Sequence, residues 1–168
     1  MTEASQVTRR SAARTPTTAT DPVAEFLDVS RSLVGIAVYS VNAAPVDITV
    51  TQYRLVAVLG AQGPLTIGEV AELLGVAQSN ASRHCDRLER LELLQRARSQ
   101  DDGRVVIVEL TASGRELIDF VTDVRRREVG SVLGSMPSAD RKRLIDAARD
   151  FNVAAAAQED RPWLTAAW

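Results

Sequence analysis

The chain has 168 residues, which is enough for one domain with a substantial hydrophobic core. Its formal net charge of -2 at pH 7 argues against a protein that coats nucleic acid without regard to sequence, although it leaves room for a local basic surface. No apolar run reaches the roughly 20 residues that span a bilayer, and no secretory signal pattern is present, so we expect a cytoplasmic protein without a membrane partner.

The two ends of the chain differ in composition from the rest. Residues 1–20 are rich in Thr, Ala and Arg and have no apolar period. That composition is also typical of transit peptides. We interpret this segment as a disordered tail, with a basic arm that touches DNA as the alternative. A second short tail, residues 161–168, holds Trp163 and Trp168.

The first helical pattern begins at Asp21 and Pro22, which suit the N-cap and the first turn of a helix. It extends to about Ala44 and carries a broad apolar stripe. The stripe consists of Val23, Phe26, Leu27, Leu33, Val34, Ala37, Val38 and Val41. We assign residues 21–47 as an N-terminal dimerisation helix.

Two helices with capping signals follow. Thr49 and Gln52 have the spacing of a capping box, and so do Thr66 and Glu69. The first of these helices continues with Tyr53, Val56 and Leu59, and the second has an apolar face of Ile67, Val70, Ala71 and Leu74. Gly75 stands where a left-handed residue would end the second helix.

After a short turn, a further helix is predicted from Gln78 to about Leu93. Its buried face is expected to hold Ala81, Cys85, Leu88 and Leu91. The remaining face is polar and suits contacts with base edges and phosphates. The candidate DNA contacts on it are Ser79, Asn80, Ser82, Arg83, His84 and Arg87. An ordinary solvated face is the alternative, since Asp86 and Glu89 lie nearby.

A β-hairpin is predicted next. Its two strand-like runs are Leu94–Arg98 and Val105–Leu110. The connection includes Asp102-Gly103, a turn dipeptide. A purely structural hairpin explains the fold, whereas a hairpin that lays an arginine along a minor groove also explains Arg98 and Arg104. Asp102 can orient one of these arginines through a charge-assisted hydrogen bond.

These elements together resemble the MarR family of bacterial transcriptional regulators. The matching features are the helix start at Thr49–Gln52, the segment Asp86-Arg87-Leu88-Glu89, the wing motif Asp102-x-Arg104, and Leu110-Thr111 leading to Gly114. No single motif is diagnostic, but the ordered set covers roughly residues 22–157. One departure is Ala77, because the residue that opens the recognition helix is often Ser in this family, so capping must come from elsewhere.

The resemblance implies a mainly α fold with a small β-hairpin wing. In this interpretation residues 48–111 form a winged helix-turn-helix, flanked by N- and C-terminal dimerisation helices. It also implies an obligate homodimer that binds a pseudo-palindromic double-stranded DNA operator, usually as a repressor. Members of the family are often released from DNA by a small ligand or by oxidation.

Residues 112–160 are assigned to C-terminal dimerisation helices. Thr111 is expected to cap a helix that runs to about Leu133, and Ser138 starts a last helix after Pro137. The apolar positions of the two helices are Leu117, Ile118, Val121, Val124, Val129, Val132, Leu144, Ile145, Ala148, Phe151 and Ala155. The first and last helices are too apolar for the small winged domain to cover. This favours a twofold homodimer over packing within one chain.

Catalysis finds little support in this sequence. His84 and Cys85 cannot form a nucleophile and base pair, because consecutive helical residues point about 100° apart. There is no glycine-rich phosphate loop and no metal-ligand cluster, so we expect neither a cofactor nor an enzyme. The single cysteine excludes an intrachain disulfide, and we interpret Cys85 as a small core residue rather than a redox sensor.

The leading hypothesis is therefore a sequence-specific DNA-binding regulator. The alternatives are a helical protein-interaction module that uses the winged fold without DNA, and an enzyme on a helical scaffold. By the resemblance, a small-molecule effector would occupy the cleft between the dimer helices and the winged domain. Its candidate lining is Val38, Tyr39, Tyr53 and Val56, with Arg54 to meet a carboxylate, which suits a small aromatic or phenolic acid.

Overall fold

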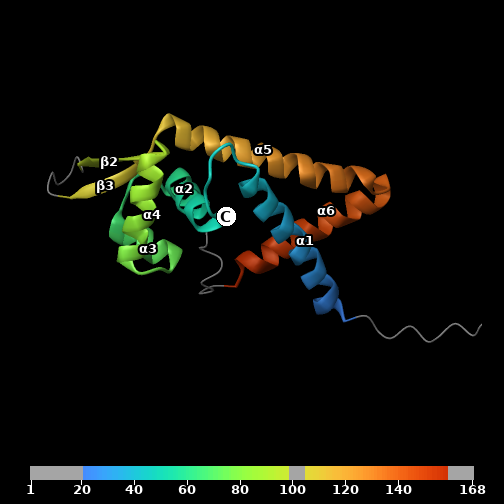
Figure 1. Ribbon diagram of the computed structural model, residues 1–168. Coiled ribbons are helices and arrows are strands. Elements are labelled where there is room, and N and C mark those ends of the chain that lie inside the picture. Colours follow the sequence, from blue (N-terminus) through green and yellow to red (C-terminus); the bar gives the residue numbers. More distant parts are fainter. Residues whose placement is uncertain (1–20, 99–104, 159–168) are drawn as a thin grey trace, which may run out of the picture.

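The computed structural model describes residues 21–98 and 105–158. They form a mainly helical fold with a small antiparallel sheet, which confirms the predicted fold class (Figure 1). The elements are α1 (Pro22–Asn42), α2 (Val50–Gln62), β1 (Leu65–Thr66), α3 (Ile67–Leu74), α4 (Gln78–Arg90), β2 (Leu94–Arg98), β3 (Val106–Leu110), α5 (Ala112–Ser135) and α6 (Ser138–Ala156). Helices α2 to α4 and the sheet lie at one end of the long helix α5, and α6 folds back from its other end towards α1 (Figure 1).

The helix starts are fixed by the predicted capping motifs. The Thr49 hydroxyl accepts a hydrogen bond from the Gln52 N–H at 3.2 Å, and the Gln52 side chain accepts one from the Thr49 N–H at 2.9 Å. Thr66 and Glu69 form the same reciprocal pair at the start of α3. Asp21 caps α1 by accepting from the N–H two residues ahead. Each motif satisfies backbone donors that the helix leaves open, so these starts follow from local sequence alone.

The turn between α3 and α4 is short because Gly75 adopts a left-handed conformation, with φ of 66°. The Val76 N–H then donates to the Ala71 carbonyl at 3.0 Å, which closes the end of α3. Three residues therefore separate the two helices, and α4 is held in a fixed orientation against α3.

The prediction that the helix after this turn extends to about Leu93 is wrong. Helix α4 ends at Arg90, Glu92 has a φ of 58°, and the Leu93 N–H donates back to the Leu88 carbonyl at 3.0 Å. The physical reason is burial, since Leu93 and Leu94 must leave the helix to enter the core. A non-glycine residue in the left-handed region therefore makes the turn.

The sheet has the order β1-β3-β2, and both pairings are antiparallel. Strands β2 and β3 confirm the predicted hairpin, although β3 begins at Val106 rather than Val105. The sequence did not indicate β1, whose two residues pair Leu65 with Val108 and Thr66 with Ile107. Two residues are too few to display a strand period, and Thr66 also serves as the N-cap of α3.

The core lies around α2 and joins it to the helix-turn-helix, the sheet and the first half of α5. Its fully buried side chains are Leu55, Val56, Val58, Val70, Ala81, Cys85, Leu88, Leu94, Val108 and Val121. Ala81, Cys85 and Leu88 form the predicted buried face of α4, which turns the rest of that helix towards solvent. Leu91, which was predicted to share this face, follows the end of α4 and is only partly buried. Among the described helices, none is long and apolar enough to cross a membrane.

Helices α1 and α6 leave most of their large apolar side chains partly exposed in the single chain, although Val41 near the end of α1 is buried. Helix α6 has no buried residue, and Phe26 of α1 contacts Phe151 of α6 with ring centroids 4.5 Å apart. Both phenylalanines are still about half exposed, at 47% and 49%. The other exposed apolar side chains of the two helices are Val23, Leu27, Val29, Leu33, Val34, Val38, Tyr39, Leu144 and Val153. Packing within one chain therefore does not cover the stripe.

Helix α5 starts against the turn that follows α4, and Gly114 permits this close approach. A Cβ atom on Gly114 would lie 2.1 Å from the Leu93 carbonyl oxygen, which is backbone and cannot rotate away. We expect Gly114→Ala to lower the free energy of unfolding by about 3 kcal/mol, because α5 must shift away from the turn. Gly130→Ala in the same helix is the control, since nothing lies within 4 Å of its Cβ position. If Gly114→Ala and Gly130→Ala unfold at the same urea concentration, this prediction is wrong.

Candidate nucleic-acid interface

The polar side of α4 carries the predicted contact residues. Ser79, Asn80 and Arg83 are exposed, whereas Ser82, His84 and Arg87 are half-buried. All six lie on a helix of 13 residues whose opposite side is anchored in the core, so one rigid element presents them. Hydroxyl, amide and guanidinium groups are the donors that read base edges and hold phosphates.

Arg83 is held in place by its own helix. Its Nη2 atom donates to the Asn80 side-chain oxygen at 2.9 Å, and its Nε atom donates to the Ser79 carbonyl at 3.3 Å. These contacts bring three of the predicted residues together in the first turns of α4. The guanidinium therefore lies near the N-terminal end of the helix instead of extending freely into solvent.

The N-terminus of α4 has no side-chain cap. Ala77 occupies the N-cap position and makes no side-chain hydrogen bond. The first backbone N–H groups of a helix lack partners within the helix, and together with the helix dipole they favour an anion. Helix N-termini of this kind are suited to binding a phosphate group.

Arg87 lies further along α4 and faces the segment between α1 and α2. Its Nη2 atom is 3.7 Å from a carboxylate oxygen of Asp47, whose side chain is fully exposed. An exposed pair at this separation contributes little to stability. The guanidinium therefore remains able to exchange Asp47 for a phosphate or a base.

Arg96 is the residue of this surface that the sequence interpretation missed. From β2, its guanidinium donates to Asp86 through one nitrogen and to Glu89 through another. Both acids belong to α4, so a single arginine bridges the helix and the wing. The hydrogen bond to Asp86 is the largest cause of a raised pKa for Arg96. The acids on which the solvated-face alternative rested are thus both paired with Arg96.

A simple signal in the sequence could have identified Arg96. Side chains alternate along a strand, and Leu94 of β2 is buried while Arg96 is half-buried. Arg96 therefore lies on the same side of β2 as Leu94, towards α4. The alternation along the strand could therefore have marked Arg96 as a residue on the apolar side of β2, although its pairing with Asp86 and Glu89 depends on how the hairpin meets α4.

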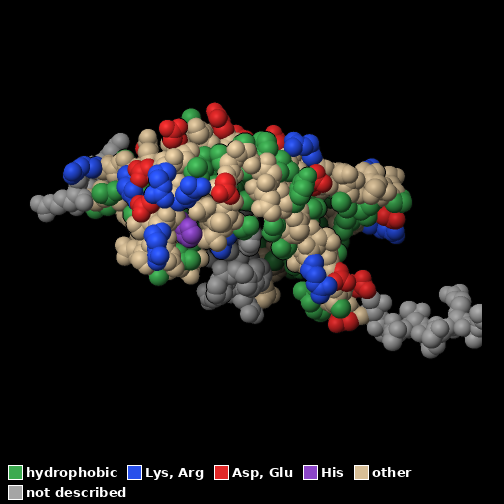
Figure 2. All heavy atoms as spheres, viewed as in Figure 1, with side chains coloured by type: hydrophobic (Ala, Val, Ile, Leu, Met, Phe, Trp, Pro, Cys, Tyr) green, Lys and Arg blue, Asp and Glu red, His purple; other side chains and the backbone are tan. Residues whose placement is uncertain are grey.

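Arg98 lies at the exposed end of β2, opposite Val106. The other two predicted wing residues, Asp102 and Arg104, lie outside the described residues. Figure 2 shows basic side chains, all of them arginines because the one lysine belongs to α6, gathered over the end of the molecule that α4 and the strands form, with Asp and Glu between them. The mixture agrees with a net charge of -2 in a chain that has 20 basic and 22 acidic residues.

Cys85 lies on the buried side of α4, with 0% of its surface exposed. Desolvation by burial raises the pKa of its thiol from 9.0 to about 11, and the acids Asp86 and Glu89 contribute in the same direction. The reactive thiolate is therefore scarce at neutral pH. This agrees with the prediction that Cys85 is a core residue.

The raised pKa of Cys85 leads to a pH prediction. Between pH 9 and about 11 the unfolded chain loses the thiol proton while the folded chain keeps it. The free energy of unfolding should therefore fall across this window, by roughly 2–3 kcal/mol from this group. Urea unfolding at several pH values tests this, with Cys85→Ala lacking the same part of the fall. An identical pH dependence in both proteins would refute the assignment.

The predicted effector residues occupy different environments. Val56 and Tyr53 are buried in the core, Arg54 is half-buried, and Val38 and Tyr39 are exposed on α1. Desolvation raises the pKa of Tyr53, against the opposing effects of the nearby Arg125 charge and a hydrogen bond with Thr122. That contact connects α2 to α5.

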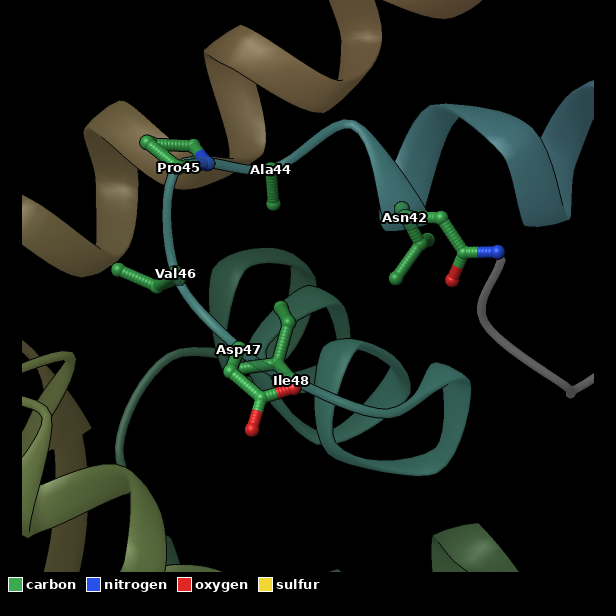
Figure 3. Close-up of a pocket in the computed structure, with 7 residues that line it drawn as sticks. Asn42, Ala44, Pro45, Val46, Asp47 and Ile48 are labelled. Carbon is green, nitrogen blue, oxygen red and sulfur yellow. The ribbon is translucent and has the colours of Figure 1, made fainter.

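A separate pocket of about 450 Å³ lies at the end of α1 and along the segment that leads to α2 (Figure 3). It is lined by Val41, Asn42, Ala44, Pro45, Val46, Asp47 and Ile48. None of the five predicted effector residues lines this pocket. Asp47, which faces Arg87 of α4, is one of its lining residues.

Comparison with known sequences gives consistent matches to one family. The MarR family profile matches residues 46–105. YhbI of Bacillus subtilis, described as an HTH-type transcriptional regulator, is 36% identical over 75 residues, which are 45% of this chain and 49% of YhbI. The HTH-type transcriptional repressor NicR of Pseudomonas putida is 28% identical over 109 residues, 65% of this chain and 69% of NicR. The chain thus spans about half the length of YhbI.

Comparison with solved structures extends the match beyond the winged region. The crystal structure of RV1404 from Mycobacterium tuberculosis superposes with a TM-score of 0.72 and is 33% identical in sequence. The match covers 83% of this chain and 98% of RV1404, so it includes helices on both sides of the helix-turn-helix.

Proposed function

We propose that this chain, which belongs to the MarR family, is a sequence-specific DNA-binding regulator of transcription. The observation that carries the proposal is the exposed polar side of α4, with Asn80 and Arg83 at its uncapped N-terminal end. Helix α4 acts as the recognition helix in a major groove, and its N-terminal residues contact base edges. The β2–β3 hairpin lies along the neighbouring minor groove.

The active species in this proposal is a homodimer. The support is the uncovered apolar stripe of α1 and α6, which remains about half exposed at residues such as Leu33 and Leu144. Burying that stripe against a second copy removes it from water, and twofold symmetry is the commonest arrangement. Two recognition helices related by a twofold axis read two inverted half-sites, with centres roughly 10 bp apart. The operator is therefore pseudo-palindromic.

The sign of regulation is repression in this proposal, for which the relative NicR, named as a transcriptional repressor, is the support. A dimer bound across two successive turns of DNA excludes other proteins, such as the transcription machinery, from the same stretch of DNA. No catalytic step is needed for this action. Control then depends on a ligand that changes the separation of the two recognition helices.

The proposed effector is a small aromatic or phenolic acid. It would lie between α1 and the winged domain, near Tyr39, Tyr53 and Arg54. Arg125 supports this location, because its Nε atom is buried and has no hydrogen-bond partner among the described residues. A carboxylate would satisfy this donor through a charge-assisted hydrogen bond. Because Tyr53 and Val56 are buried, entry of such a ligand requires α1 or α2 to move, which couples binding to the DNA-binding surface.

Selection of bound duplexes from a random DNA pool tests the function directly. The expected result is enrichment of one inverted-repeat sequence, followed by a tight gel shift on that sequence and a weak shift on a scrambled duplex. Enrichment of no sequence would leave the alternative of a protein-interaction module that uses the winged fold without DNA. If one duplex is enriched, adding salicylate to its complex with the protein tests release by a phenolic acid.

A further inference from the structure

We propose that Arg96 acts as an electrostatic mask, which keeps the carboxylates of Asp86 and Glu89 from opposing DNA and from capturing the arginines of α4. The inference rests on the proposed function, since it concerns how the same surface binds DNA. Arg96 itself is not a DNA contact in this account. Its role is to pair with the Asp86 and Glu89 carboxylates and so offset their negative charge.

Helix α4 carries acidic side chains among its arginines. Asp86 lies three residues after Arg83 and four residues before Arg90. Side chains three or four residues apart on a helix are neighbours, so the Asp86 carboxylate is within reach of both arginines. Glu89 follows three residues later on the same side of the helix. Two acids thus stand among the residues that must face a polyanion.

The structure shows where these two carboxylates point. Each accepts a hydrogen bond from a different nitrogen of the Arg96 guanidinium. The three side chains are partly exposed, at 29% for Arg96, 44% for Asp86 and 38% for Glu89. Among the described contacts, Arg83 instead pairs with Asn80 and Arg87 faces Asp47. The acids of α4 are therefore occupied by the wing, and the arginines of α4 are not paired with them.

The position of Arg96 in the sheet makes the bridge rigid. Arg96 pairs with Val108 of β3, and Val108 is fully buried and pairs in turn with Leu65 of β1. Arg96 is thus the β2 residue that pairs with the middle of the central strand β3. Loss of Arg96 removes one positive charge and also releases two negative charges next to the DNA phosphates. Like charges brought together in this way weaken binding strongly.

The test compares two ways of breaking the same bridge with opposite changes of charge. Arg96→Gln exposes both acids, and we expect about 10- to 100-fold weaker binding to the selected duplex. The double variant Asp86→Asn with Glu89→Gln also breaks the bridge but removes the acids, and we expect binding equal to or tighter than wild type. The triple variant with all three changes should return to within about threefold of wild type, because no charge is left unmasked.

A purely structural role for Arg96 gives a different pattern. If the bridge only fixes the wing, the double and triple variants should bind as weakly as Arg96→Gln, and that result would overturn the proposal. Should Arg96→Gln fail to fold, the double variant decides alone by its affinity. Salt gives a further readout, since the loss in Arg96→Gln should shrink at roughly 0.5 M salt, where exposed charges are screened. If the wild-type protein binds no duplex, the proposed function is wrong. If the wild-type protein binds and the double variant binds more weakly, only the proposed role of Arg96 is wrong.

Discussion

Replacing Leu33 and Leu144 by aspartate is expected to convert the protein from a dimer to a folded monomer that no longer retains operator DNA. Both side chains are partly exposed in the single chain, at 52% and 40%, so the charge costs the monomer little. In the dimer each aspartate would be buried against the apolar stripe of the second copy, where an unpaired charge costs several kcal/mol. DNA affinity falls when dimerisation is lost, because a monomer reads only one half-site.

Sedimentation velocity at micromolar concentration measures this effect, and circular dichroism shows whether the variant keeps its helices. The matched control adds two negative charges at exposed polar positions outside the stripe, with Gln62→Asp and Ser113→Asp. The control should remain a dimer. A wild-type protein that sediments as a compact monomer would remove the basis of this prediction.

Arg87→Ala is expected to weaken DNA binding, because the guanidinium on the polar side of α4 would lose a contact with a phosphate or a base. If Arg87 reads a base, the loss is about 1–3 kcal/mol and discrimination at that base pair relaxes. If it holds a phosphate, binding weakens on all sequences and the slope of log affinity against log salt falls by about one unit. In the free protein Arg87 lies 3.7 Å from the exposed Asp47, a pair that contributes little to stability, so its removal should leave the unfolding midpoint nearly unchanged.

Gel shifts over a salt series on the selected and scrambled duplexes separate these two roles. Arg149→Ala is the matched control, since Arg149 is an exposed arginine of α6 that forms an exposed ion pair with Asp146. That variant should bind as wild type does. Equal affinity of Arg87→Ala and wild type on every duplex would exclude Arg87 from the interface.

The helix starts could be predicted because their causes are local. Thr49 with Gln52 and Thr66 with Glu69 satisfy backbone donors within one turn of helix, and Gly75 ends α3 through its own conformational freedom. The end of α4 could not be predicted in this way. Glu92 adopts a left-handed conformation only because the next two leucines are drawn into a core built by distant segments.

The interface was predictable to a similar extent. Helical period identified the buried side of α4 at Cys85 and Leu88, and hence the side that faces solvent. The bridge from Arg96 to Asp86 and Glu89 joins residues ten and seven positions apart and depends on how the hairpin meets α4. The effector residues came from the family resemblance, and sequence alone could not tell that Val56 is fully buried while Tyr39 is 56% exposed.

The most direct test of the whole account is the affinity and stoichiometry of the wild-type protein on its selected duplex. Fluorescence anisotropy against a scrambled duplex of the same composition gives the specificity, and sedimentation of the complex gives its mass. We expect two chains per duplex and binding at least about 1,000-fold tighter than on the scrambled sequence. One chain per duplex, or equal affinity for both sequences, would contradict the account.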